Sequence, residues 1–246
     1  MLTTTQFELE FTEVATSDLP TAAILVAAGN ATRMGGNKQF LPLRGIPVLA
    51  RSLMAFQNCP KIRDIVVVVR DEEIPDVQRL AEEYHIHKLT AVVAGGAQRQ
   101  DSVEHGLLAL ADDIVYVAIH DGARPMITPA SIEAVLTDAR AHGAAALGVP
   151  VKDTIKQVDG QMRIERTIPR ETLYAVQTPQ VFDVAIYKKA LDYAKANALA
   201  VTDDCMLCEA AGFPVFITTG SYSNIKITTP EDIAVAENYL AGEEQP

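Results

Sequence analysis

The chain has 246 residues, of which 48% are hydrophobic and 22% are charged, and its formal net charge at pH 7 is -11. This length suits one large α/β domain with a buried core. The acidic excess argues against sequence-independent binding to nucleic acid, which depends on Lys and Arg side chains that neutralise phosphates. No apolar run approaches the roughly 20 residues that a membrane-spanning helix needs.

The first 20 residues include four acidic side chains and no early basic cluster. They match neither a secretory signal nor an Arg-rich transit peptide, so we interpret residues 1–20 as an acidic extension. The chain has three cysteines, an odd number that forms no disulfide framework. We therefore expect a reducing, cytoplasmic setting.

From Thr21 onward, apolar segments rich in Val and Ile alternate with segments of helical periodicity. This alternation predicts a Rossmann-like, mostly parallel sheet with helices on both faces. The predicted strands are Ala22 to Ala27, Asp64 to Val69, Leu89 to Ala94, Ile114 to His120 and Ala145 to Val149. The predicted helices between them are Val48 to Gln57, Asp76 to Tyr84, Ser102 to Leu110 and Ser131 to His142.

After Pro150 the pattern changes to a hairpin. Thr154 to Val158 and Gln161 to Ile168 flank Asp159-Gly160, a dipeptide typical of two-residue hairpin turns. We therefore predict a β-arm over about residues 152–174 that protrudes from the sheet.

The remainder returns to α/β character, and we interpret residues 21–242 as one domain and residues 243–246 as a frayed tail. A final helix is expected to begin at Thr229-Pro230-Glu231-Asp232, with Thr as N-cap and Pro at the first helical position. The other expected elements are a strand near Ala175, helices at Val184 to Asn197 and Asp203 to Ala211, and short strands at Val215 to Thr218 and Ile225 to Ile227.

The segment Ala27 to Lys38 follows the first predicted strand, at the sheet edge where open α/β sheets usually bind ligands. Its small residues allow backbone N–H groups to approach phosphate oxygens, and Arg33 and Lys38 supply positive charge. The spacing fits neither G-x-x-x-x-G-K-[ST] nor G-x-G-x-x-G. The segment therefore indicates a phosphate-binding loop of another type, with a flexible Gly-rich turn as the alternative.

Two further segments follow predicted strands. Gly95 to Ser102 opens a helix, and it has either a binding role or a capping role with Asp101 as N-cap. Asp121 comes directly after the fourth predicted strand, where a lone carboxylate beside phosphates suits a Mg²⁺ ligand because hard cations prefer oxygen. The neighbouring His120 is either structural, as strand-end histidines more commonly are, or mechanistic.

Two other features also have competing interpretations. Cys205 and Cys208 form a C-x-x-C pair, but no second pair or His cluster accompanies it, so helix packing is favoured over a zinc half-site or redox pair. Lys226 lies on the expected Ile225 to Ile227 strand, on the face opposite the two isoleucines, where a solvated edge position is the ordinary interpretation.

Taken in order, the motifs of this chain resemble those of the 2-C-methyl-D-erythritol 4-phosphate cytidylyltransferase family, over nearly all of Thr21 to Leu240. They are A-A-G-x-x-x-R-M followed by K-Q-F, then G-G-x-x-R-Q-D-S-V, H-D-G-A-R-P, V-K-D-T, T-P-Q-x-F, T-D-D and N-I-K-I-T-x-P-E-D. The resemblance implies cytidylyl transfer from CTP to a polyol phosphate, in the synthesis of isoprenoid precursors by the non-mevalonate pathway. Such a reaction brings two anions together, so positioned cations both permit the encounter and stabilise the transition state.

The resemblance also implies a role for individual residues. Those implied to bind the nucleotide are Ala27, Ala28, Gly29, Arg33, Lys38, Gly96, Ala97, Arg99, Ser102, Asp121 and Gly122, with Gly96, Ala97 and Ser102 at the cytosine. Those implied to bind the acceptor are Asp121, Arg124, Thr154, Arg170, Thr178, Thr202, Asp203 and Lys226. Arg33, Lys38, Lys226 and Arg170 are implied to be catalytic, and Asp121 to bind Mg²⁺. Thr202 and Asp203 also fit a simple helix N-terminus.

The family further implies a homodimer in which Thr154 and Arg170 of one arm reach the site of the neighbouring subunit. The chain departs from the commonest pattern at Ala31 and Gly122, where Gly and Ala are frequent; both changes keep a small residue. Two other functions compete with the leading one. The first is a ribitol or ribulose 5-phosphate cytidylyltransferase, and the second is a CTP-binding regulatory module without catalysis, which the retained cations disfavour.

Overall fold

The computed structural model of the chain describes residues 19–29 and 38–243. Arg33, Ala31 and almost all of the acidic extension lie outside these ranges. The sheet is mostly parallel, in the order β11-β7-β10-β6-β1-β4-β5. Its strands are β1 (Thr21–Val26), β4 (Asp64–Val69), β5 (Leu89–Ala94), β6 (Tyr116–Asp121), β7 (Ala144–Pro150), β10 (Tyr174–Asp183) and β11 (Phe216–Thr219).

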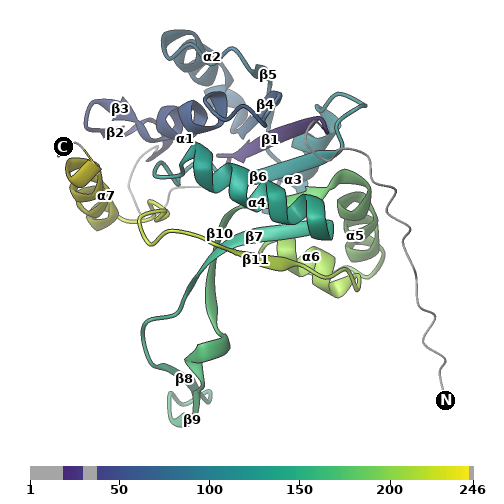
Figure 1. The fold of residues 1–246 in the computed structure, drawn as a ribbon, viewed down its shortest axis with the longest axis vertical. Helices are drawn as coiled ribbons and strands as arrows, with labels where there is room; N and C mark the ends of the chain where they lie inside the picture. Colours follow the sequence, from purple (N-terminus) through teal and green to yellow (C-terminus); the bar gives the residue numbers. More distant parts are fainter. Residues whose placement is uncertain (1–18, 30–37, 244–246) are drawn as a thin grey trace.

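Helices cover both faces of the sheet, as the sequence predicts (Figure 1). Successive residues of a strand point to opposite faces, so in β1 Ala23 and Leu25 join one core and Ile24 joins the other. One face packs against α1 (Val48–Gln57), α2 (Ile74–Glu83) and α4 (Pro129–His142). The other packs against α3 (Arg99–Leu108), α5 (Val184–Ala196) and α6 (Asp204–Ala210).

β10 is the antiparallel member of the sheet. It lies between β6 and β7 and is antiparallel to both, whereas β11 is parallel to β7. This strand brings the chain back from the arm into the centre of the sheet. Gln177, Thr178 and Gln180 of β10 are consequently buried beside the end of β6.

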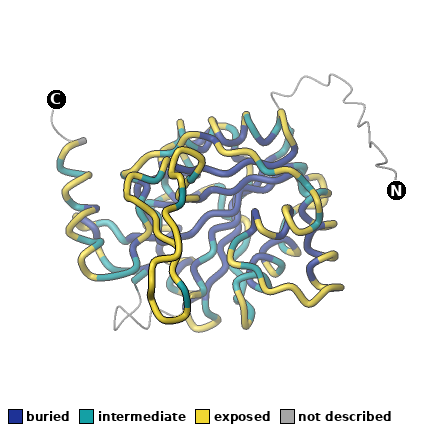
Figure 2. The backbone as a smooth tube through the Cα atoms, turned by 90° about the horizontal axis from the view of Figure 1, so that it is seen from below, coloured by how far each residue is buried: buried dark blue, intermediate teal, exposed yellow. Residues whose placement is uncertain are grey.

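The predicted arm is confirmed, with β8 (Ile155–Val158) antiparallel to β9 (Ile164–Ile168). It protrudes from the sheet (Figure 1) and is exposed along most of its length (Figure 2). The predicted two-residue turn is wrong, because the second strand begins at Ile164 and not at Gln161. The Asp159 carboxylate accepts hydrogen bonds from the backbone N–H groups of Gln161 and Arg163, which stabilises a wider loop.

The predicted strand Ile225 to Ile227 is also wrong. This segment has no sheet partner in the described structure, and its backbone makes isolated bonds instead, such as Ile227 N–H to the carbonyl of Ala123 at 2.8 Å. The expected alternation of side chains nevertheless holds. Ile225 and Ile227 pack with Leu43 in a small cluster under α7 (Pro230–Glu243), and Lys226 points the other way.

The cysteines behave as packing residues. Cys59, Cys205 and Cys208 are all buried and unpaired with one another. Cys205 and Cys208 lie on α6 in the same core as Tyr187, which confirms the packing interpretation. Burial raises the pKa of the Cys208 thiol to about 12, so the thiol stays protonated and unreactive. No helix in the described ranges is both long enough and apolar enough to cross a bilayer.

Candidate active site

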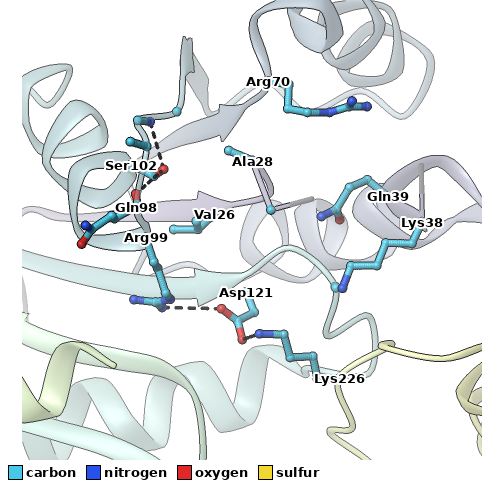
Figure 3. A pocket seen from close by; sticks show the side chains of 15 residues that line it. Val26, Ala28, Lys38, Gln39, Arg70, Gln98, Arg99, Ser102, Asp121 and Lys226 are labelled. Atoms are coloured by element: carbon cyan, nitrogen blue, oxygen red, sulfur yellow. Dashed lines mark hydrogen bonds and ion pairs between the residues drawn. The ribbon is translucent and has the colours of Figure 1, made fainter. Parts of the chain in front are cut away.

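A pocket of about 440 Å³ lies at the C-terminal ends of β1, β4, β5 and β6 (Figure 3). These strands are parallel, so the loops that follow them meet at one edge of the sheet, where open α/β folds bind ligands. The pocket is lined by Val26, Ala28, Gly29, Lys38, Gln39, Arg70, Gly95, Gly96, Ala97, Gln98, Arg99, Ser102, Asp121, Ala123 and Lys226.

The loop after β1 is anchored at both ends of its described part. The Ala27 N–H donates to the carbonyl of Val68 at 2.7 Å, and the Ala27 carbonyl accepts from Gln39 Nε2 at 3.1 Å. Lys38, in the 3-10 helix η1 (Lys38–Phe40), lines the pocket and its Nζ donates to the carbonyl of Ile227 at 2.9 Å. The predicted cation Lys38 and the backbone of Ala28 and Gly29 therefore share one cavity.

Two glycines line the pocket between the end of β5 and the start of α3. A Cβ at Gly95 would lie 2.4 Å from the Cβ of Ala28, and one at Gly96 would lie 2.2 Å from the Cβ of Asp101. Both distances are shorter than any carbon–carbon contact allows, so no larger residue fits without movement of the loop. This part of the pocket wall is therefore closely packed backbone without side chains.

The helix that follows this wall begins earlier than expected. Its N-cap is Gln98, whose N–H donates to the Asp101 carboxylate at 3.0 Å, so the expected N-cap at Asp101 is wrong. Ser102 lies one turn further on, where its hydroxyl accepts from Gly96 N–H at 3.1 Å and donates to the Gln98 carbonyl at 3.0 Å. The hydroxyl thus fixes the loop, and Arg99 becomes the first residue of α3.

Asp121, at the end of β6, is the electrostatic centre of the site. Its side chain is 12% exposed and, within the described part of the chain, faces three cations: Lys226 Nζ at 2.8 Å, Arg99 Nη2 at 3.5 Å and Arg124 Nε at 3.8 Å. Burial alone would raise the pKa of this carboxyl, but Lys226, Arg99 and Arg124 together lower the pKa to about 2. Asp121 is therefore ionised at neutral pH. It holds the side chains of Lys226, Arg99 and Arg124 close together, where they can also interact with a bound phosphate.

The fit of a metal ion depends on these same oxygens. Within the described ranges, no group of three His, Cys, Asp or Glu side chains is arranged to hold a metal. Asp121 offers two oxygens that already face cations. A hard cation would therefore need most of its ligands from phosphates and water, which is how Mg²⁺ commonly binds beside nucleotides. The donor set suits an ion that arrives with a triphosphate.

His120 and Thr178 are buried residues that hold the backbone of Asp121 in place. Thr178 Oγ1 accepts from the Asp121 N–H at 3.0 Å and lies 3.0 Å from His120 Nδ1. His120 Nε2 lies 3.3 Å from the Arg124 carbonyl, which can only accept, so Nε2 carries the proton and Nδ1 accepts from Thr178. Burial lowers the pKa of His120 to about 3, which keeps the ring neutral. The geometry supports the structural interpretation of His120.

Arg124 links the site to the loop that bears Lys226. Its side chain is 13% exposed, and Nη1 donates to the Asn224 carbonyl at 2.7 Å. Asn224 in turn donates to the Thr178 carbonyl at 3.0 Å. Gly122 lies beneath the same site: its N–H donates to Val26, and its carbonyl accepts from Ser52. Neither Arg124 nor Gly122 lines the pocket itself.

The remaining residues expected at the acceptor do not meet the pocket within this chain. Thr154 and Arg170 are exposed on the arm, where Arg170 donates to the Lys152 carbonyl. Thr202 is exposed, and Asp203 caps α6 by accepting from the Met206 N–H at 3.0 Å. The helix N-terminus interpretation of Thr202 and Asp203 is thus confirmed for Asp203.

Three residues that shape the site were not predicted from the sequence. Gln39 holds the first loop through its amide, Arg70 lines the pocket just after β4, and Asp204 pairs with Arg99. Gln39 and Asp204 belong to the K-Q-F and T-D-D motifs. Arg70 could have been found from its place at the C-terminal end of a parallel strand.

Comparison with known proteins agrees with this geometry. Residues 21–242 match the family model described as 2-C-methyl-D-erythritol 4-phosphate cytidylyltransferase. The chain is 48% identical to the protein of that name from Dehalococcoides mccartyi, over 89% of this chain and 95% of the relative. It is 46% identical to the one from Halalkalibacterium halodurans, over 91% and 98%.

The fold agrees as well. A crystal structure of 4-diphosphocytidyl-2C-methyl-D-erythritol synthase from Anaerococcus prevotii superimposes with a TM-score of 0.83 at 30% identity, covering 93% of this chain and all of that one. The structure of 2-C-methyl-D-erythritol 4-phosphate cytidylyltransferase from Thermus thermophilus gives 0.74 at 32% identity, covering 89% and 98%. The Rossmann-like fold, the ordered motifs and the pocket all fall inside the matched region. The chain belongs to the 2-C-methyl-D-erythritol 4-phosphate cytidylyltransferase family.

Proposed function

We propose that this chain transfers the cytidylyl group of CTP to 2-C-methyl-D-erythritol 4-phosphate, in the synthesis of isoprenoid precursors by the non-mevalonate pathway. A phosphate oxygen of the acceptor attacks the α-phosphorus of CTP, the bond to the β-phosphate oxygen breaks, and pyrophosphate leaves. The product is 4-diphosphocytidyl-2-C-methyl-D-erythritol. The observation that carries the proposal is one pocket that is lined both by the cations Lys38 and Lys226 and by the side-chain-free backbone of Gly95 and Gly96.

The residues divide this work between binding and charge. The wall at Gly95 and Gly96 leaves space for a flat base, and Lys38 and Lys226 supply charge to the phosphates. Both lysines now bond to protein oxygens, Lys38 to Ile227 and Lys226 to Asp121, so their ammonium groups are held in place before a ligand arrives. Preorganised cations of this kind stabilise charge that develops in a transition state at no cost of reorganisation.

We include Mg²⁺ in the proposal, with Asp121 and the triphosphate as its ligands. The ion would neutralise phosphate charge and thereby ease the approach of the anionic acceptor. Asp121 suits the role because its carboxyl stays ionised over the whole physiological range. Omission of divalent cations should abolish turnover, and increasing Mg²⁺ concentration should restore it to a saturating value.

We also propose that the active form is a homodimer joined through the arms, in the cytoplasm. The arm has apolar side chains that one chain leaves uncovered, such as Met162 at 78% and Ile164 at 59% exposure. Arg170 and Thr154 lie on this arm, so a second subunit is what would bring them to a pocket. The three buried, unpaired cysteines suit a reducing compartment.

Subunit mixing tests the shared site. Arg170→Ala and Lys226→Met should each be nearly inactive as homodimers. If Arg170 serves the partner's pocket, their mixture should recover about a quarter of wild-type activity, because half of the dimers then contain one intact site. A mixture that stays inactive while hybrid dimers form would show that each site uses both residues from one chain.

Parallel assays with two acceptors test the reaction itself. Pyrophosphate release from CTP should be efficient with 2-C-methyl-D-erythritol 4-phosphate and weak with ribitol 5-phosphate or ribulose 5-phosphate. The reverse order would assign the chain to the pentitol-type cytidylyltransferases. Tight CTP binding by calorimetry without turnover of any of these acceptors would instead indicate a regulatory module.

A further inference from the structure

Arg99 enters the site from the start of α3 and points toward Asp121 (Figure 3). Its two terminal nitrogens have different partners. Nη2 lies 3.5 Å from Asp121 Oδ1, at the outer limit of a hydrogen bond, whereas Nη1 makes a close ion pair with Asp204 Oδ2. The stronger partner of this pocket-lining cation is thus a residue outside the pocket.

Asp204 is an anion that the fold has enclosed. Its side chain is 1% exposed, and a buried carboxylate is tolerated only when charged or hydrogen-bonded partners compensate for lost hydration. Arg99 occupies Oδ2, and the Tyr187 hydroxyl donates to Oδ1 at 2.7 Å. Each oxygen of the Asp204 carboxylate therefore has a partner, and the two partners fix the orientation of the carboxylate.

The groups behind Asp204 are equally fixed. Tyr187 is fully buried on α5, and burial together with Asp204 holds its pKa well above the usual value, so the hydroxyl remains a donor. The Asp204 N–H donates to Gln180 Oε1 at 3.0 Å, which joins α6 to β10. Asp204, Tyr187 and Gln180 thus form a connected support for Arg99, which is anchored in the core between the sheet and helices α3, α5 and α6.

This support determines which cation pairs with which carboxylate: Arg99 pairs mainly with Asp204, and Lys226 pairs with Asp121. Asp121 Oδ2 lies 2.8 Å from Lys226 Nζ, whereas among the residues that the structure describes Oδ1 makes a single long contact, to Arg99. An Arg99 released from Asp204 would be drawn toward Asp121, the other carboxylate that it contacts. It would then move from its present place in the pocket lining and compete with Lys226 for the same carboxylate.

We propose that Asp204, held by Tyr187, is a positioning residue that sets the place of the Arg99 guanidinium in the nucleotide pocket. It touches no substrate and acts on CTP binding through Arg99. The inference rests on the proposed function, because it takes CTP as the ligand of the pocket.

The test is a double-mutant cycle on the CTP dissociation constant, measured by calorimetry with Asp204→Asn, Arg99→Ala and the double variant. Asp204→Asn keeps the side-chain shape but removes the charge, and it should weaken CTP binding about tenfold while the turnover rate at saturating CTP falls less than about threefold. In the Arg99→Ala background the same change should have no further effect, because the residue it acts through is gone.

Tyr187→Phe gives an independent reading if Asp204→Asn does not fold. It removes only the hydroxyl, so we expect about a threefold loss of CTP affinity that also disappears in the Arg99→Ala background. Glu209→Gln is the matched control, since it neutralises an exposed carboxylate on the same helix and should leave CTP affinity unchanged.

Two results would overturn the positioning role. The first is unchanged CTP affinity in a folded Asp204 or Tyr187 variant. The second is an equal loss with and without Arg99, which would mean that Asp204 merely stabilises the fold. Failure of the wild-type chain to bind CTP is a separate outcome, which rejects the proposed function and is visible before any variant is compared.

Discussion

Replacement of Lys226 by Met separates the catalytic contribution of this cation from its contribution to the fold. Methionine has a similar length and volume but no charge. The Lys226 side chain is 41% exposed, so solvent screens its ion pair with Asp121 and the pair contributes about 1 kcal/mol or less to the free energy of unfolding. Asp121 also keeps Arg99 and Arg124 as cationic neighbours at 3.5 and 3.8 Å. We therefore expect only a small loss of stability.

The loss in rate should be much larger. A preorganised donor that meets charge in the transition state typically accelerates turnover by a factor of about 10² to 10³, which corresponds to about 3 to 4 kcal/mol. The assay is pyrophosphate release with both substrates varied, combined with denaturant unfolding of the same preparation. Lys189→Met, on the exposed face of α5, is the matched control and should change neither quantity.

The two measurements distinguish the roles of Lys226. A turnover rate that falls about a hundredfold or more, with nearly unchanged stability, supports direct stabilisation of the reacting phosphates. A variant with normal turnover that unfolds at lower denaturant concentration would refute the reasoning, because Lys226 would then serve only to neutralise Asp121. A rise in the KM for CTP alone would assign the lysine to ground-state binding.

Three further predictions concern the surroundings of the site. The folded-state pKa of His120 is lowered to about 3 from its usual 6.5, so as the pH falls between these values the unfolded chain binds a proton that the folded chain does not. The free energy of unfolding should therefore fall by up to about 1.4 kcal/mol per pH unit in this range, and above pH 6.5 this loss is absent. Unfolding titrations of His120→Gln should show a flatter acid slope, and an unchanged slope would exclude His120 as the origin. Gly96→Ala places a Cβ 2.2 Å from Asp101, so calorimetry should show CTP affinity at least about tenfold weaker, and wild-type affinity would mean that the wall yields. Removal of residues 155–168 should give a monomer in sedimentation that retains CTP binding but not turnover, and a persistent dimer would place the interface elsewhere.

Much of the fold followed from periodicity. The strands beside the pocket were predicted to within about two residues, because their sequences are apolar runs; β1, β4 and β6 are buried on both faces, and β5 at the sheet edge is half-buried. The hairpin arm was likewise predicted from Asp159-Gly160. Its turn was not, because the Asp159 side chain binds two backbone N–H groups and sets the loop length. The Ile225 to Ile227 segment has strand-like composition but finds no strand beside it among the described residues.

The sequence by itself determined the cations and small residues of the site, because Lys38, Gly96 and Asp121 each end or follow a predicted strand. Tertiary structure alone decided which charges meet. Asp121 and Lys226 are 105 positions apart, as are Arg99 and Asp204, and only the packing of α6 and the final loop against the sheet brings each pair together. Local propensity has no information about such contacts, since they depend on the order of strands and not on neighbouring residues. The buried support behind Arg99 is therefore visible only in the folded chain.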